Sequence, residues 1–360
     1  MRSLIIAFAA LWLVAPATAQ PQPDLKPDLK IDAVARTKVI EGSLAALAKY
    51  YVFPEVAKKI DAEIRKHVAA RKYDQLTSAR AFAETLTADL QAVSHDKHMR
   101  VMFSAEPFPD RRADGPPPAA EIERFRDQMK FWNAGYMKAE RLDGNVGYLR
   151  LDSFAPPDEA APRAAAAMTL LAETGALIID VRYNGGGHPA GVALLVSYLF
   201  AADDEQHIND IYWRPDNSTK QYWTALDLSG RRYPKKPVYV LTSAKTFSGA
   251  EEFAYDVQNL KRATLVGEVT GGGANPGGPE KVHPNFLVNV PRGRAISPVT
   301  KTNWEGTGVK PDIAVPADKA FDTAYLAALE KVKATIDPKK RPGMAEEIDD
   351  AIAKLKSAAK

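Results

Sequence analysis

A serine stands where a buried strand is expected to pass into a helix. Ser248 and Gly249 fall in the segment TSAKTFSGAEEFAYDV, between the apolar run at 238–241 and residues with helical spacing. A turn of small residues at such a junction exposes a hydroxyl at a helix N-terminus, where developing negative charge is favoured. Ser248 is therefore a candidate nucleophile. The alternative is a helix cap, because serine is a preferred N-cap residue and Glu251 would complete a capping box.

Three consecutive glycines, Gly185 to Gly187, follow an apolar run in the segment LIIDVRYNGGGHPAG. Glycine lets the backbone turn sharply and present amide groups to a ligand. The segment lacks the Gly-Lys-Ser/Thr ending of a P-loop and the spaced glycines of a dinucleotide-binding fingerprint, which argues against nucleotide binding. A plain turn needs only one or two glycines, so a cradle for an anion or oxyanion is the better interpretation.

A histidine and a glutamate complete the candidate residues. His98 lies in SHDKHMRVMF, and Glu305 lies in TNWEGTGVKPDI, a loop that offers no helical reason for a carboxylate. Histidine has the ordinary pKa best suited to accepting and returning a proton near neutral pH. The alternatives are a structural histidine and a surface glutamate. His95 and His98 have no third ligand nearby in the sequence, so no metal site is predicted.

The elements that must position these residues alternate between strands and helices. Strands are predicted in GNVGYLRLDSF, GALIIDVRYN, KPVYVLTS and ATLVGEV, and helices in DEAAPRAAAAMTLLAET, GHPAGVALLVSYLF and SGAEEFAYDVQNL. Each strand is nearly all apolar, which is typical of a mostly parallel sheet that is covered on both faces. We therefore predict an α/β catalytic domain over residues 121–316.

The regions on either side of this domain have helical patterns. From Ile31 to Leu90 apolar residues recur at spacings of three and four, and Pro54 and Ser78 suit helix starts. This pattern predicts a small three-helix domain within residues 20–104, with a strand in HMRVMFS near its end. A Pro-rich linker is expected at residues 105–120 and two amphipathic helices at 317–360.

Residues 1–19 have the features of a secretory signal peptide. A cation at Arg2 precedes an apolar stretch from Leu4 to Val14 and a small-x-small ending at 17–19. We expect cleavage before Gln20 and export to the periplasm or the cell exterior, with no integral membrane segment left in the mature chain. The alternative is an N-terminal membrane anchor.

Composition narrows the function classes further. The sequence contains no cysteine, which excludes disulfides, thiolate catalysis, zinc-thiolate sites and a lipid anchor on cysteine. The formal net charge is +3 and no dense basic cluster is present, so we expect no nucleic-acid partner.

Several of these stretches together resemble the S41 serine peptidases. The strand followed by NGGG, the segment TFSGAEEF, the segment GEVTGGG and the segment NWEGTGVKPDI occur in that family's order, over about residues 35 to 315. The likeness is to the branch similar to interphotoreceptor retinoid-binding protein and the tricorn core, and it implies a ClpP/crotonase-like fold. It also implies that Ser248 is the nucleophile, His98 the general base and Glu305 the carboxylate that orients the histidine. The oxyanion hole would use the amides of Gly249 and Gly186, with no metal and no cofactor.

The sequence departs from other members of the family in three ways. Residues 270–273 read Thr-Gly-Gly-Gly where the tail-specific members carry a catalytic lysine, and no room is left for a PDZ domain. Lys97 also replaces the serine that precedes the histidine in the tricorn core. We therefore expect a Ser/His/Glu triad that acts on a peptide or protein substrate. Alternatives are a non-catalytic binding protein for an apolar ligand of the retinoid or fatty-acid type, and a cell-envelope interaction module.

Overall fold

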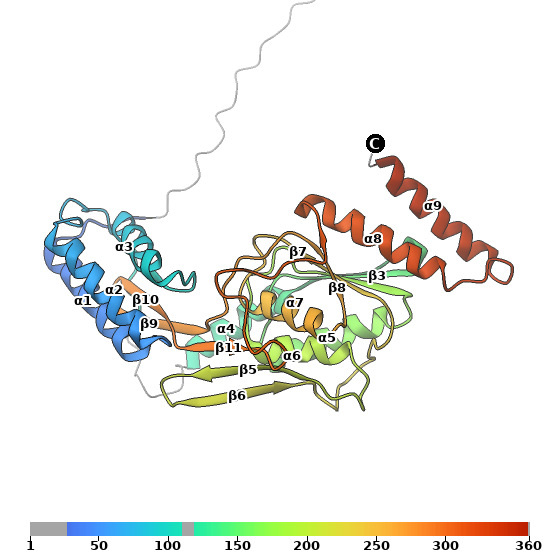
Figure 1. The fold of residues 1–360 in the computed structure, drawn as a ribbon, viewed down its shortest axis with the longest axis horizontal. Coiled ribbons are helices and arrows are strands. Elements are labelled where there is room, and N and C mark those ends of the chain that lie inside the picture. The colour runs from blue at the N-terminus through green and yellow to red at the C-terminus, as the bar shows by residue number, and fades with distance from the viewer. Residues whose placement is uncertain (1–26, 110–118, 359–360) are drawn as a thin grey trace, which may run out of the picture.

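The protein is described by a computed structural model over residues 27–109 and 119–358. The predicted signal peptide and most of the expected Pro-rich linker lie outside the described residues. Three helices form one end of the molecule, a central sheet with its covering helices forms the middle, and the C-terminal helix lies at the other end (Figure 1). Within the described ranges, no helix combines the length and the apolar character that a membrane span requires.

The N-terminal helices confirm the predicted three-helix arrangement. They are α1 (Ala33–Tyr50), α2 (Pro54–Ala69) and α3 (Ala79–Ser94). Pro54 occupies the first position of α2, and the Ser78 side chain accepts a hydrogen bond from the amide of Ala81 to cap α3. Both residues therefore begin their helices as the sequence predicted, with proline at the first helical position and serine as the N-cap.

A small antiparallel sheet joins these helices to residues far along the chain. β1 (Arg100–Phe103) pairs with β10 (Phe286–Pro291), which pairs with β9 (Gly277–His283). Phe286 and Val288 of β10 are fully buried in one cluster with side chains of α1, α2 and α3. The sequence pattern predicted that residues 277–291 belong to the α/β domain, whereas in the structure they complete the core of the helical end.

The central sheet confirms the prediction of a mostly parallel α/β core. Its strand order is β12-β8-β7-β4-β3-β2, and every neighbouring pair is parallel except β3 and β2. The strands are β2 (Tyr136–Leu142), β3 (Val146–Leu151), β4 (Ala176–Asp180), β7 (Val238–Thr242), β8 (Thr264–Gly267) and β12 (Ile313–Ala314). All five residues of β4 and of β7 are buried, as expected of strands that are covered on both faces.

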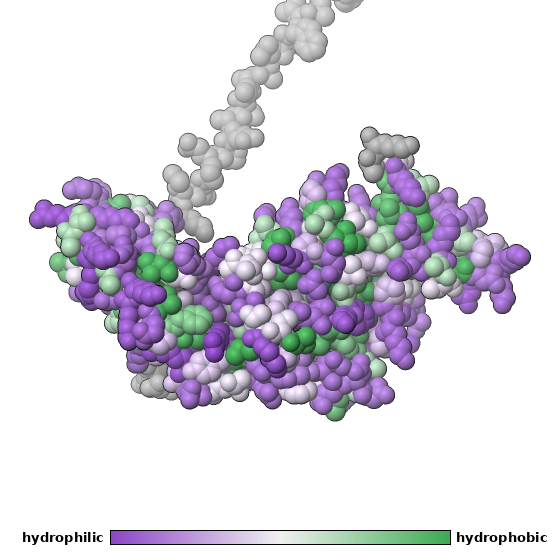
Figure 2. All heavy atoms as spheres, in the orientation of Figure 1, coloured by the Kyte–Doolittle hydropathy of each residue, from purple (hydrophilic) through white to green (hydrophobic). Residues whose placement is uncertain are grey.

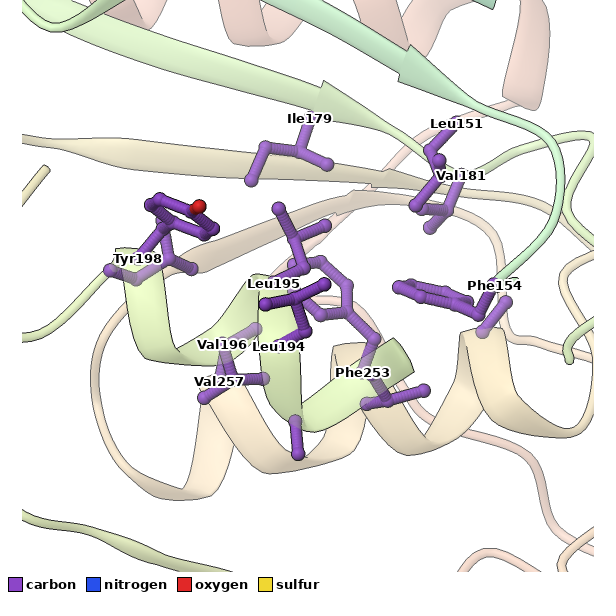
Figure 3. Packing of buried hydrophobic residues seen from close by; sticks show 14 of the residues in the cluster. Leu151, Phe154, Ile179, Val181, Leu194, Leu195, Val196, Tyr198, Phe253 and Val257 are labelled. Atoms are coloured by element: carbon purple, nitrogen blue, oxygen red, sulfur yellow. The ribbon is translucent and has the colours of Figure 1, made fainter. Parts of the chain in front are cut away.

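Helices cover the two faces of this sheet. Leu177 and Ile179 of β4 pack with one set of helices, and Ala176 and Ile178 pack with the other, because successive side chains of a strand point to opposite faces. The first set is α5 (Pro157–Leu171), α6 (Pro189–Tyr198) and α7 (Gly249–Asn259), and the second is α8 (Ala317–Lys333) and α9 (Pro342–Ala358). Figure 3 shows the first interface, where Phe253 of α7 lies close to Phe154 and to side chains of α6.

The structure also contains elements that the sequence analysis did not identify. They are α4 (Ala119–Phe131), the 3-10 turns at Asn133–Gly135 and Asp143–Asn145, the strands β2, β9, β10 and β12, and a sheet of order β11-β5-β6 made of β11 (Gly293–Ile296), β5 (His207–Trp213) and β6 (Ser218–Trp223). β6 is exposed at five of its six positions, so it lacks the alternating apolar pattern that marks a strand in a sequence. The face shown in Figure 2 is mainly hydrophilic and is hollowed between the N-terminal helices and α8.

Candidate active site

Ser248 lies in a strained backbone conformation at the start of α7. The turn at residues 243–247 follows β7, and Ser248 is the N-cap residue with φ 54° and ψ −122°. A non-glycine residue rarely adopts a positive φ, and such strain costs on the order of 1–3 kcal/mol. The amide of Phe247 donates to the carbonyl of Asn184 at 3.1 Å, which helps to fix this turn. The hydroxyl is thus held at a helix N-terminus beside the glycine turn.

Glu251 ties the serine turn to the segment Thr270 to Gly273. It is fully buried, and its Oε2 accepts hydrogen bonds from the amides of Ser248 at 2.9 Å and Gly273 at 2.8 Å. Its Oε1 accepts from the Thr270 hydroxyl at 2.5 Å and the Gly272 amide at 2.6 Å. The sequence assigned Glu251 only to a capping box. Its wider role was not visible there, because its partners lie about twenty residues away.

The triple-glycine turn packs directly against Ser248. A β-carbon on Gly186, whose φ is +111°, would lie 2.8 Å from Ser248 Cβ and 2.9 Å from the amide nitrogen of Gly249. A β-carbon on Gly249 would lie 3.1 Å from the amide nitrogen of Gly187. These approaches require glycine, and they bring the two stretches together as the sequence analysis expected.

The Gly186 amide, however, already has a partner. It donates to Asn184 Oδ1 at 2.8 Å, and Asn184 is itself fully buried with its Nδ2 bonded to the carbonyl of Leu151 at 3.0 Å. The Gly249 amide is at the first position of α7, among those that helix geometry leaves without an intrahelical acceptor. The Gly187 amide, within the described part of the chain, donates to no acceptor, and its nitrogen lies close to Gly249.

His98 reaches this region from the N-terminal end of the molecule. It lies in the turn between α3 and β1, where its amide donates to Asp96 Oδ1 at 3.0 Å and its carbonyl accepts from Asn289 Nδ2 at 2.8 Å. The imidazole lies against the ring of Phe247, with the ring centres 4.6 Å apart. Phe247 immediately precedes Ser248, so the structure places the histidine at the serine turn. Among the hydrogen bonds of residues 27–109 and 119–358, none joins His98 to the Ser248 hydroxyl.

Glu305 and Asp96 both approach the imidazole. Atoms of Asp96, His98 and Glu305 that could bind a proton or a metal ion lie within 4.8 Å of one another. Glu305 Oε2 accepts a hydrogen bond from the amide of Ala274, whereas Glu305 Oε1 and His98 Nδ1 are buried and have no partner in the described structure. This set of one imidazole and two carboxylates suits proton transfer or metal coordination.

Asp96 is the member of this set to which the sequence gave no role. It is 1% exposed, and its Oδ2 accepts from Asn275 Nδ2 at 2.9 Å and from the Tyr51 hydroxyl at 3.4 Å. The Asp-x-His spacing was visible in the sequence. The two distant donors that hold the carboxylate were not.

Burial sets the protonation preferences of the site. Burial, assisted by the charge of Arg100, lowers the pKa of His98 to about 4. Burial and the nearby Asp96 raise the pKa of Glu305 to about 8. Lys97, which the sequence suggested as a neighbour of functional interest, donates its Nζ to the carbonyl of Gly271 at 2.6 Å. The cation that acts on the imidazole is Arg100.

Comparisons with known proteins place this arrangement in a family. The description "Peptidase family S41" matches residues 145–315, and the N-terminal domain of this family in eukaryotic IRBP matches residues 33–129. The chain belongs to peptidase family S41. This confirms the resemblance that the sequence motifs indicated.

Two curated relatives are similar to part of the chain. The carboxyl-terminal-processing protease of Synechocystis sp. is 34% identical over 142 residues, which is 39% of this chain and 31% of that protein. The chloroplastic C-terminal processing peptidase of Tetradesmus obliquus is 33% identical over 135 residues, which is 35% of this chain and 26% of that protein. The matched region thus spans about a quarter to a third of the length of these relatives.

A solved structure shares the fold of this chain over most of its length. A crystal structure from Parabacteroides merdae ATCC 43184 superimposes with a TM-score of 0.58 at 20% identity, and the match covers 84% of this chain and 99% of that one. At this identity the likeness concerns the fold alone.

Proposed function

We propose that this protein is a serine peptidase that forms an acyl-enzyme on Ser248. The observation that carries the proposal is the strained Ser248, which lies against the triple-glycine turn and directly follows Phe247, the residue whose ring contacts His98. Membership of family S41, with two C-terminal processing peptidases among its relatives, supports a peptide or protein substrate.

In the proposed reaction, Ser248 Oγ attacks the carbonyl carbon of the scissile bond while its proton passes to His98. The resulting oxyanion collapses, the carbon–nitrogen bond breaks, and His98 returns the proton to the leaving amine. Water then attacks the acyl-enzyme with His98 again as base, releasing the acid and restoring the serine. Glu305 orients the imidazole and stabilises its charged form, a role supported by the two unpaired buried atoms His98 Nδ1 and Glu305 Oε1.

The oxyanion hole in this proposal uses the Gly249 amide and the triple-glycine turn. Gly186 was the expected second donor, but the bond from its amide to Asn184 favours Gly187 as the group that faces the oxyanion. Gly186 then contributes by letting the turn approach Ser248. Such preorganised donors typically stabilise the transition state by about 3–4 kcal/mol each.

Labelling with a serine-directed probe tests the proposal. A fluorophosphonate should label the wild-type protein at Ser248 and should not label a Ser248→Ala variant, whereas Ser218→Ala removes an exposed serine in β6 and should leave labelling unchanged. Peptide hydrolysis should follow the same order, with a loss on the order of 10⁶ in turnover for Ser248→Ala. A wild-type protein that neither reacts with the probe nor cleaves a broad peptide library would overturn it.

The second candidate function is that of a binding protein for an apolar ligand. The match of the N-terminal region to the IRBP domain favours this candidate. A binder of this kind has no use for a reactive hydroxyl. Saturable binding of a fluorescent fatty acid or retinol, equal in wild type and Ser248→Ala and unaccompanied by probe labelling, would favour it over the peptidase.

We also propose that the mature protein is exported, with its N-terminus at Gln20 and with the helical domain at 20–104 preceding a catalytic domain at 121–316. Residues 1–19 resemble a signal peptide in composition, which supports a location in the periplasm or outside the cell. N-terminal sequencing of protein recovered from an export-competent host tests the cleavage. Recovery of the uncleaved chain beginning at Met1 would contradict it.

A further inference from the structure

A cluster of buried oxygen atoms lies one turn beyond Ser248 on α7. Glu252 and Asp256 are four residues apart, which places them on the same face of the helix, and they are only 4% and 2% exposed. Asn209 of β5 is fully buried, and its Nδ2 donates a hydrogen bond to Glu252 Oε1 at 3.1 Å. Glu252 therefore links α7 to β5, and Asp256 lies one helical turn further along the same face of α7.

The cluster contains acceptors without matching donors. Both carboxylate oxygens of Asp256 and the Oδ1 atom of Asn209 are buried and, in the part of the chain that the structure describes, have no hydrogen-bond partner. No lysine, arginine or histidine of those residues acts on either carboxyl group. Buried acceptors without partners are costly, and uncompensated buried charge is more costly still. The cluster therefore needs positive charge or protons from elsewhere.

The position of Asp256 adds to this requirement. It lies in the last turn of α7 (Gly249–Asn259), where the helix dipole is negative and disfavours a carboxylate. Phe253 and Val257 point from α7 into the apolar core (Figure 3), so the carboxyl groups, each one residue earlier, lie about 100° around the helix from that contact. Burial raises the pKa of both groups, to about 7 for Glu252 and well above its ordinary value for Asp256.

We propose that Glu252, Asp256 and Asn209 bind one divalent cation that fixes α7 against β5. Two carboxylates balance a charge of +2, and all the donor atoms are hard oxygens. Together the three side chains offer five oxygens, close to the six to eight that Ca²⁺ takes, and carboxylates bind Ca²⁺ in bidentate fashion. Mg²⁺ keeps several water ligands, which suits an enclosed site less well. The cation would stabilise the fold and would take no part in the reaction, for which no metal is expected. The proposal does not depend on the proposed peptidase activity.

Thermal unfolding of the chelator-treated full-length protein at pH 7.5 tests this proposal. Ca²⁺ in about hundred-fold excess over its Kd should raise the Tm by roughly 3–5 °C, because a ligand that binds only the folded state stabilises it by mass action. Mg²⁺ should raise it less. Isothermal titration should show one Ca²⁺ bound per chain.

Isosteric variants distinguish Ca²⁺ binding at this site from a general effect of ions on the stability of the protein. Asp256→Asn, alone and combined with Glu252→Gln, should abolish the Ca²⁺-dependent rise in Tm. The matched control is Glu346→Gln with Asp350→Asn, an exposed pair of the same residue types and spacing in α9, and it should keep the full rise. If the Asp256 variant fails to fold, titration of the wild type alone decides. A wild type that binds no Ca²⁺, or an Asp256→Asn variant that keeps the rise, would show that the carboxyl groups hold protons or water instead.

Discussion

Gly186 and Ser248 approach so closely that a β-carbon on the glycine would lie 2.8 Å from the β-carbon of the serine. The two residues are far apart in the sequence, and the contact exists because β4 and β7 are parallel neighbours in the central sheet. The turns that follow them therefore leave the same edge. The contact couples the glycine turn to the position of the hydroxyl.

Substitution of this glycine should impair catalysis by moving the serine. Gly186→Ala places a methyl group against Ser248 and a side chain at a φ of +111°, so we expect kcat to fall about 10²-fold, as for other displacements near 1 Å. Gly185→Ala is the matched control, because a β-carbon there meets no atom within 4 Å. Steady-state kinetics on a peptide substrate would measure the difference. Equal losses in the two variants would contradict the proposed role of the contact.

The pH profile should be governed by Glu305. His98, with a pKa near 4, is already neutral and competent as a base at pH 6, whereas Glu305, with a pKa near 8, is still protonated there. The carboxylate that stabilises the imidazolium forms only as pH rises, so kcat/KM should increase through about pH 8. An imidazole with its ordinary pKa would instead place this rise at about pH 6.5.

Glu305→Gln should lower the rate and remove that limb, because the variant has no carboxyl group to titrate at this position. Glu346→Gln, which alters an exposed carboxylate in α9, should keep the limb. A limb near pH 8 that persists in Glu305→Gln would assign it to another group.

Removal of the base should abolish activity, whereas removal of lysines should not. His98→Ala is expected to lower kcat about 10⁴-fold or more, because the serine loses the group that accepts its proton. The control substitutions are Lys to Ala at Lys245, Lys261, Lys281, Lys301 and Lys310. A lysine variant as inactive as His98→Ala, with an unchanged circular dichroism spectrum, would indicate a Ser/Lys mechanism.

Arg214 should matter for holding the histidine-bearing end in place. It follows β5, and its Nη1 and Nη2 atoms donate to the carbonyls of Tyr51 at 2.6 Å and Ala48 at 3.1 Å, near the C-terminal end of α1. We expect Arg214→Ala to reduce stability by about 1–3 kcal/mol and to lower kcat as well. Arg231→Ala, which breaks an exposed pair with Glu173, should cost less than about 1 kcal/mol. Urea unfolding would measure both, and equal effects would contradict the expectation.

The sequence by itself determined the elements whose signals are local. The apolar strands β3, β4, β7 and β8, the helices that follow the first three of them, and the three N-terminal helices all carry a clear periodicity or capping residue within a few positions. The family and the candidate residues Ser248, His98 and Glu305 were also accessible there, because their motifs are short and contiguous.

Only the tertiary structure decided how these pieces meet. β9 and β10 complete the core of the N-terminal helices, and Glu251 receives donors from a segment about twenty residues away. Asn184 Oδ1 accepts a hydrogen bond from the Gly186 amide, and Asp96 and Glu305 both lie close to the His98 imidazole. Hydrogen bonds, desolvation and charge act over a few ångströms of space, whereas sequence patterns report neighbours along the chain. The protonation of the site and the buried oxygen cluster on α7 therefore follow from packing, which no local pattern encodes.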